Sequence, residues 1–267
     1  MLTALREDIK ALWRARALLV VMSKREIAAR HTGTAAGIVW PFLQPLLIVA
    51  AYYLVLDRVF AMRLGPDAPV QSVGLYLIVG ALPWMAFCDA LSRGANSLVE
   101  AGSILQKNPL PPVLYPVRAV LASGAIYGPL MVFIVVCYGP QHHFNSVLLL
   151  LPVLMLLQTF ATSMLAYLLA ILIAALRDVA QIVNFSLSIG IYLSPILFPL
   201  SMFPEAWRWT LWLNPITPYA SAYQNIILQG IMPSYIEWTL IGIWIIFTGY
   251  LLNIILTQSR DQIIDWL

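Results

Sequence analysis

The sequence predicts an all-α integral membrane protein with six transmembrane helices, an N-terminal amphipathic interfacial helix, and re-entrant short helices before the last span. Three observations predict this fold class. Of the 267 residues, 61% are hydrophobic and 10% are charged, whereas an ordinary soluble domain has about 25% charged residues. The mean hydropathy is +0.84. Apolar runs of about 20 residues, the length that crosses a bilayer as a helix, alternate with short polar segments.

Residues 1–32 are predicted to lie on the membrane surface. Leu5, Ile9 and Leu12 recur at helical spacing with basic residues on the opposite face, as in a helix that lies in the interface. The segment lacks the central apolar core of a cleavable signal, so we expect it to stay on the protein. Its basic face either only fixes the topology or grips anionic lipid headgroups. The candidate residues for contact with a lipid headgroup are Arg14, Lys24, Arg25 and Arg30.

Six later runs are apolar and long enough to cross the membrane. In the first run, Pro41 and Pro45 fall in the first turns, where a proline disturbs a helix least. The segment 57–71, which contains Gly65, Pro66 and Pro69, is predicted to be an aqueous loop. The predicted spans are residues 37–56, 73–91, 113–138, 147–176, 179–200 and 238–256.

Two pairs of glycines have the small-xxx-small spacing that lets membrane helices approach closely. Gly33 and Gly37 precede the first span, and Gly124 and Gly128 lie inside the third. Both pairs are predicted to serve helix packing.

The most polar interruption of the membrane region is the stretch 92–118. It begins with small and polar residues that favour a short helix, and then meets four prolines, which end it. We interpret this stretch as a docking element for another protein, because it is too structured for a simple connector and too short for a soluble domain. Its prolines are Pro109, Pro111, Pro112 and Pro116.

The fifth span follows a charged pair, Arg177 and Asp178, that indicates a tight turn at the surface. Inside this span, polar residues recur at spacings of three, four and four, which places them on one helix face. The stripe consists of Gln181, Asn184, Ser188 and Tyr192.

Between the fifth and the last span, the apolar pieces 206–213 and 219–228 are too short to cross the membrane. We predict short helices that enter the membrane and return, as is allowed where protein or a water-filled cavity shields the backbone. The residues 259–267 form the predicted cytoplasmic tail.

The distribution of positive charge predicts that both termini are cytoplasmic. With six spans, this orientation leaves only Arg58, Arg63 and Arg208 outside, and the other 12 of the 15 Lys and Arg residues inside. Such an excess satisfies the positive-inside rule.

The sequence also indicates what chemistry is missing. No lysine follows a glycine-rich phosphate-binding pattern, so ATP hydrolysis cannot be assigned to this chain. The carboxylates Asp57, Asp89, Asp178 and Glu237 all fall near predicted span ends, which argues against an ion-driven carrier. No nucleophile and base pair up within the predicted spans, which disfavours an intramembrane enzyme. We therefore expect no catalytic, metal or cofactor site in this chain. If the protein uses energy, we expect a partner protein to supply it.

Several segments, in this order and spacing, resemble the permease subunit of type-2 ABC exporters, in particular the polysaccharide branch that exports capsule, O-antigen and teichoic acid chains. The resemblance covers nearly the whole chain. The segments that carry it are Thr32–Gly33, Gly37–Pro45, Asn108–Pro116, Arg177–Ile182, Ser194–Pro199 and Asn214–Pro218.

The resemblance implies a single membrane domain over residues 1–267, formed by the interfacial region 1–32, the six-helix part 37–256 and the tail 259–267. It implies a homodimer in the bacterial inner membrane that binds two copies of a cytoplasmic ATPase, which would hold ATP and Mg. The implied substrate is a lipid-linked polysaccharide, with a capsular one preferred and O-antigen or teichoic acid as alternatives. A drug or antibiotic exporter is the second alternative. Membrane lipids and periplasmic or outer-membrane export proteins are candidate further partners, and no nucleic acid is expected.

The resemblance also assigns site residues. The region 97–107 is similar to the family's coupling helix, and the turn after the fourth span would be a second ATPase contact. The coupling residues are Ser97, Glu100, Ser103, Gln106, Lys107, Arg177 and Asp178. For the translocation path we expect the polar stripe of span five and one face of span one, although the aromatic side chains could equally pack or line the interface. The path residues are Trp40, Gln44, Tyr52, Gln181, Asn184, Ser188 and Tyr192.

Overall fold

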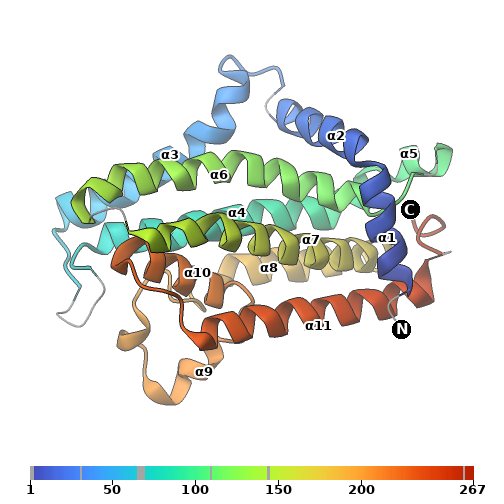
Figure 1. The fold of residues 1–267 in the computed structure, drawn as a ribbon. Helices are drawn as coiled ribbons and strands as arrows, with labels where there is room; N and C mark the ends of the chain where they lie inside the picture. Colours follow the sequence, from blue (N-terminus) through green and yellow to red (C-terminus); the bar gives the residue numbers. More distant parts are fainter. Residues whose placement is uncertain (1–2, 31, 65–69, 109, 143–144, 261) are drawn as a thin grey trace.

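The computed structural model describes residues 3–267 apart from 31, 65–69, 109, 143–144 and 261. Every regular element in this part of the chain is a helix, as the composition predicts (Figure 1). Four residues with predicted places in the loop 57–71 and in the docking stretch lie outside the described residues, namely Gly65, Pro66, Pro69 and Pro109.

Five described helices are long and apolar enough to cross a membrane. The first is Gly37–Val59, which consists of a short 3₁₀ turn η1 (Gly37–Val39), α3 (Trp40–Tyr53) and a π-helical end η2 (Leu54–Val59). The fourth combines the 3₁₀ turn η3 (Ser146–Leu150) with α7 (Leu151–Ala175). The others are α4 (Val73–Glu100), α6 (Leu114–His142) and α11 (Tyr235–Ser259).

Helix α4 is the centre of the bundle. In its most apolar stretch 72% of the residues are buried within the subunit, against 11% for the span that contains α3. Helices α3, α6, α7, α8 and α10 all pack against α4. Because these neighbours surround it on several sides, α4 is the most buried of the five spanning helices, and the span that contains α3 is the least buried.

The predicted count of six spans is not confirmed, because the fifth predicted span is short. Helix α8 (Val179–Gly190) has 12 residues, about 18 Å at 1.5 Å per residue, and turns follow it. The physical reason lies in Pro195 and Pro199, which lack the N–H group that a continuing helix requires. The hydroxyl of Tyr76 instead donates to the carbonyl oxygen of Pro195 at 2.8 Å and ties this turn to α4.

The predicted short elements before the last span are present. They are the 3₁₀ turns η4 (Leu200–Met202) and η5 (Glu205–Trp207), then α9 (Arg208–Leu211), α10 (Thr217–Gln224) and the π-helix η6 (Asn225–Gln229). The side-chain amide of Asn214 donates to the carbonyl oxygen of Gly190 at 3.0 Å, so the chain between α9 and α10 reaches the end of α8. A re-entrant path through a membrane stays a prediction.

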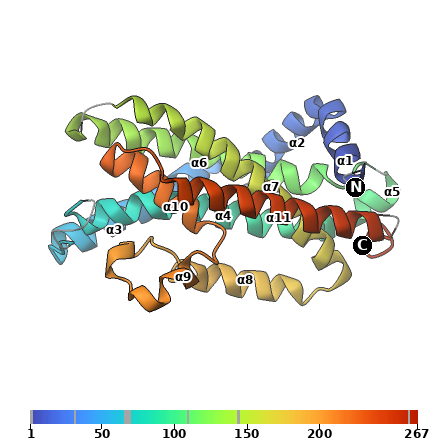
Figure 2. The ribbon, with the colours of Figure 1, turned by 60° about the horizontal axis from the view of Figure 1, so that its bottom comes forward.

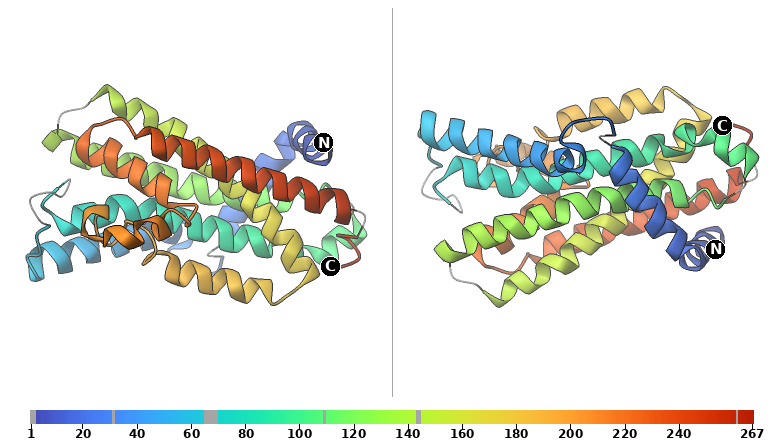
Figure 3. Two further views of the ribbon diagram at one scale, coloured as in Figure 1. Left: turned by 90° about the horizontal axis from the view of Figure 1, so that it is seen from below. Right: turned by 90° about the horizontal axis from the view of Figure 1, so that it is seen from above.

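The interfacial region forms two helices, α1 (Thr3–Arg14) and α2 (Arg16–Ala29). Figures 1 and 3 show α1, the small helix α5 (Gly102–Lys107), the turn between α7 and α8, and both chain ends at the same end of the bundle. We call this end the termini end, and the opposite one the far end. Figure 2 shows α9 and α10 in the far half.

The first small-xxx-small prediction is wrong. Gly33 and Gly37 have φ values of +85° and +49° in the turn before α3, and a Cβ built on either one meets no atom within 4 Å. They serve a left-handed backbone conformation rather than helix packing. The second pair does pack, since Cβ atoms at Gly124 and Gly128 would lie 3.8 and 3.4 Å from Thr159 and Met155 of α7.

Candidate functional site

The predicted docking element is formed by the end of α4 and by α5, with a break at Ala101. Ser97 lies on α4, is buried, and donates to the carbonyl oxygen of Gly94 at 2.7 Å. Its side chain therefore bonds back to its own helix rather than facing outward. The other coupling residues predicted here, Glu100, Ser103, Gln106 and Lys107, are exposed.

The turn after α7 lies at the same end of the bundle as α5 (Figure 1). Arg177 and Asp178 are both exposed in it. Two apolar side chains accompany these polar groups, Ile104 at 53% and Leu176 at 65% exposure. Neither residue was predicted from the sequence, although an isolated apolar residue within a polar segment could have indicated it. This end of the bundle thus exposes both charged and apolar side chains, a mixture that also occurs in protein interfaces.

The C-terminal tail braces α5 from the other side. A Cβ on Gly102, the first residue of α5, would lie 3.0 Å from the carbonyl oxygen of Leu267. Ile263 of the tail is 1% exposed and belongs to the core under α5. The last residues of the chain thus hold the predicted docking helix at a fixed distance from the bundle.

The first helix in turn holds the tail. Arg260 forms ion pairs with Glu7 and with Asp8 of α1, the latter at 3.2 Å, and the hydroxyl of Tyr167 donates to the other oxygen of Asp8 at 3.2 Å. Burial raises the pKa of the Asp8 carboxyl above its ordinary value, and Arg260 opposes that shift. Helix α1 is therefore part of the same assembly as α5 and the tail.

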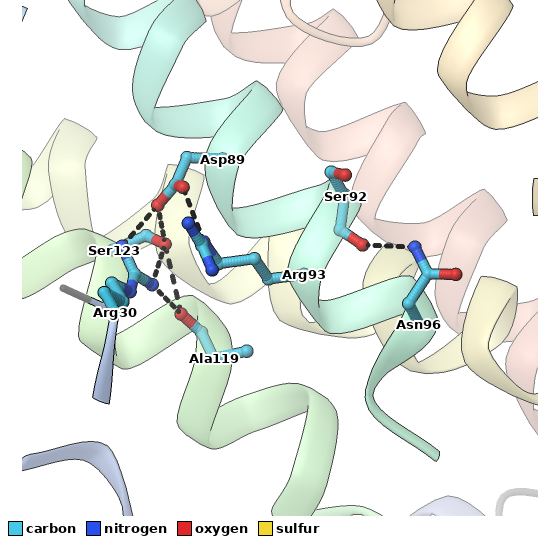
Figure 4. Close-up of polar contacts among 7 residues, drawn as sticks. All are labelled: Arg30, Asp89, Ser92, Arg93, Asn96, Ala119 and Ser123. Atoms are coloured by element: carbon cyan, nitrogen blue, oxygen red, sulfur yellow. Dashed lines mark hydrogen bonds and ion pairs between the residues drawn. The ribbon is translucent and has the colours of Figure 1, made fainter. Parts of the chain in front are cut away.

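A half-buried ion-pair network joins the end of α2 to α4 and α6 (Figure 4). The guanidinium of Arg30, which follows α2, pairs with the Asp89 carboxylate at 2.7 Å, and Arg93 pairs with the other oxygen at 2.8 Å. Ser123 of α6 donates to Asp89 and accepts from Arg30 at 2.9 Å. A second ion pair, Arg118 with Glu26 at 3.7 Å, also joins α6 to α2.

This network changes the interpretation of Arg30. The sequence placed it among free cations at the membrane surface, but its side chain is 4% exposed and its charge is neutralised inside the protein. The other three predicted headgroup residues, Arg14, Lys24 and Arg25, are exposed. Between α1 and α2 lies a concave surface of about 530 Å³ whose lining includes Trp13, Arg14 and Arg16.

The predicted path residues fall on two helices that flank α4. Figure 3 shows α3 and α8 along one edge of the bundle. The polar stripe Gln181, Asn184, Ser188 and Tyr192 is exposed over its whole length, with Tyr192 in the turn after α8 at 63% exposure. On α3, Trp40 and Gln44 are exposed, whereas Tyr52 is half-buried against the core.

Residues 17–228 match the family described as ABC-2 type transporter. This chain belongs to the ABC-2 type transporter family. As a permease of this family it is a transport subunit, and ABC-2 permeases typically pair with an ATPase subunit.

Named relatives of this ABC-2 permease share most of its length. It is 30% identical to the O-antigen export system permease protein RfbA of Myxococcus xanthus over 230 residues, which cover 84% of this chain and 85% of the relative. Two proteins of Klebsiella pneumoniae with the same name are 24% and 23% identical over 241 residues, 89% of this chain and 88% of each relative.

Proposed function

We propose that this chain is the membrane-spanning subunit of an ATP-driven exporter that moves a lipid-linked polysaccharide of the O-antigen type across the bacterial inner membrane. The observation that carries the proposal is the 30% identity to an O-antigen export permease over 84% of the chain. The sequence favoured a capsular substrate with O-antigen as an alternative, and the alternative fits better, because all three relatives reported above are named for O-antigen.

The termini end is the proposed ATPase contact. Exposed charged groups of α5 and of the turn Arg177–Asp178 flank the exposed apolar side chains of Ile104 and Leu176. A groove on a cytoplasmic ATPase can take such side chains while the charged rim sets the orientation. This assignment places both chain ends in the cytoplasm, in agreement with the excess of positive charge there.

A second copy of the chain is proposed to pack against the side of the subunit that carries α3 and α8. The span that contains α3 is the least buried of the five, and the polar stripe of α8 is exposed. In hydrocarbon, Asn184 and Ser188 would gain nothing by facing lipid, so they favour a partner helix or a water-filled path. Amide and hydroxyl groups can exchange hydrogen bonds with sugar hydroxyls as a polysaccharide slides past.

The proposed place for a lipid headgroup is the concave surface between α1 and α2. Arg14 and Arg16 offer positive charge at its edge, and the exposed indole of Trp13 suits the membrane interface. Because Arg30 is paired inside the protein, we assign headgroup contact to Arg14, Lys24 and Arg25 without it.

Deletion of the gene in its own bacterium tests the function. We expect the surface polysaccharide to disappear and its lipid-linked precursor to accumulate on the inner side of the membrane, with both effects reversed by the intact gene. A normal surface polysaccharide together with raised sensitivity to antibiotics would contradict the proposal and favour a drug exporter.

Native mass measurement of the purified complex should show two permease and two ATPase chains, and an active complex with one permease would exclude the dimer.

A further inference from the structure

A cavity of about 640 Å³ lies at the far end, away from the polar stripe of α8. Its walls come from the first turns of α4 and α11, the segment after α8, and the helices α10 and η6. The volume falls within the range of roughly 300–1,000 Å³ that is typical of ligand pockets. None of the residues assigned to the translocation path lines it.

One wall of this cavity is fixed by a closed hydrogen-bond network. Glu237 is 4% exposed, and both of its carboxylate oxygens accept from the amide of Asn225, at 2.9 and 3.1 Å. The backbone N–H of Ser234 donates to the same carboxylate at 2.8 Å, and the amide of Gln229 donates to Asn225 at 3.0 Å. The network holds η6, a π-helix of a kind often found at functional sites, against the start of α11.

Other polar groups in the lining are not used by the protein. Within the described part of the chain, the indole N–H of Trp212 and the hydroxyls of Ser201 and Ser221 make no hydrogen bond, although all three residues line the cavity. Trp212 also offers an aromatic face. The cavity thus combines a rigid acceptor-rich wall with free donors and an aromatic surface.

The charge of the lining limits the ligand. No Lys, Arg or His is among the described residues that line the cavity, so an anion would find no counter-charge. The carboxylate of Glu237 has no cationic partner among the described residues and would repel an anion further. A neutral polyhydroxylated molecule fits these groups, since its hydroxyls can exchange hydrogen bonds with amides and serines while its C–H faces contact the indole.

We propose that this cavity is a saccharide-binding site that holds a neutral sugar unit at the far end of each subunit. The inference rests on the proposed function in one respect, because the exported polysaccharide would be the natural source of that sugar. The site is separate from the α8 path and lies within one subunit, so each subunit would bind sugar without a residue from another copy.

Binding of oligosaccharides to the full chain, purified with its ATPase in lipid nanodiscs, tests the site. The probes are short neutral oligosaccharides released from the surface polysaccharide of the bacterium that carries the gene, and saturation-transfer NMR measures binding. We expect Trp212→Ala to raise Kd about fivefold, since an aromatic contact is worth about 1 kcal/mol. Ser221→Leu, which narrows the cavity and replaces a hydroxyl by an apolar group, should weaken binding further. Trp212→Phe should show a smaller loss, because it keeps an aromatic face while it removes the N–H group.

Trp209→Ala is the matched control, because Trp209 lies on α9, is 60% exposed and does not line the cavity. All variants must co-purify with the ATPase. Absence of binding to the wild-type complex, or equal binding by the Ser221→Leu and Trp209→Ala variants, would overturn the inference. The result is independent of the deletion experiment: a strain that loses its surface polysaccharide while the purified complex binds no sugar refutes the site and leaves the proposed function intact.

Discussion

Replacement of Asp89 by Asn should release α2 from α4 and α6. The side chain of Arg30 is 4% exposed and that of Asp89 is 19% exposed, so Asp89→Asn leaves a buried guanidinium without its counter-charge while the side-chain volume is kept. Breaking a buried ion pair by changing one partner costs about 3–5 kcal/mol, or roughly 10²- to 10⁴-fold in the docking equilibrium of α2. The pair Arg118–Glu26 remains and limits the effect to loosening of α2.

The accessibility of Ser23 measures this release. Ser23 is a buried residue of α2, so Ser23→Cys, in a background in which Cys88 and Cys137 are replaced, should be protected from a water-soluble maleimide. Asp89→Asn should raise the labelling rate strongly and lower the export rate. The matched control is Glu205→Gln, which breaks an exposed ion pair with Arg208 and should change stability by no more than about 1 kcal/mol.

A second variant separates charge from shape. The double change Arg30→Met and Asp89→Asn removes both charges of the central pair, and it should restore much of the protection at position 23, since apolar replacement of a buried pair is often tolerated. Unchanged labelling in Asp89→Asn, equal to that of Glu205→Gln, would refute the view that this network holds α2 in place.

Three further outcomes are expected. A Gly/Ser replacement of residues 102–107 should leave the protein inserted but lower ATPase co-purification and stop export, and full export by this variant would exclude α5 as the docking element. Gly102→Val should weaken ATPase coupling more mildly, because its Cβ would lie 3.0 Å from the carbonyl oxygen of Leu267. Deletion of the last six residues should have a similar effect. Wild-type ATPase binding and export in both variants would show that the tail does not support α5. Single cysteines at Asn184, Ser188 and Tyr192, in a chain that lacks Cys88 and Cys137, should react with water-soluble thiol reagents. Bulky adducts at these positions should stop export while ATPase binding persists. If all three cysteines are protected in every nucleotide state, the translocation path lies along α3 instead.

Most of the helical spans can be predicted from the sequence, because the hydropathy of a segment depends only on its own residues. The first, third, fourth and last spans begin and end within about four residues of their predicted limits, as expected for boundaries set by local signals. The fifth fails for a reason also visible in the sequence: Pro195 and Pro199 end regular hydrogen bonding, and an apolar segment can then be buried as turns instead of a helix.

The Arg30–Asp89 pair could not be predicted, because 59 residues separate its partners and only the packing of α2 on α4 and α6 brings them together. The isolated clues were present, since Asp89 and Arg93 are charged residues with helical spacing beside an apolar run. The same limit applies to the cavity at the far end, whose lining comes from segments between Tyr76 and Glu237. By contrast, Gln181, Asn184 and Ser188 of the polar stripe lie within α8, so their spacing alone indicated a shared face.

ATP-driven transport in a purified system tests the central claim most directly. The permease and its ATPase are reconstituted into liposomes that carry the lipid-linked polysaccharide of the source bacterium, and an added glycosidase that cannot cross the membrane reports which sugar chains lie on its side. The account predicts that ATP moves the polysaccharide across the bilayer, and that neither ADP nor the permease with residues 102–107 replaced does so. ATP hydrolysis by a stable complex with no movement of the polysaccharide, but with movement of a small drug, would contradict it.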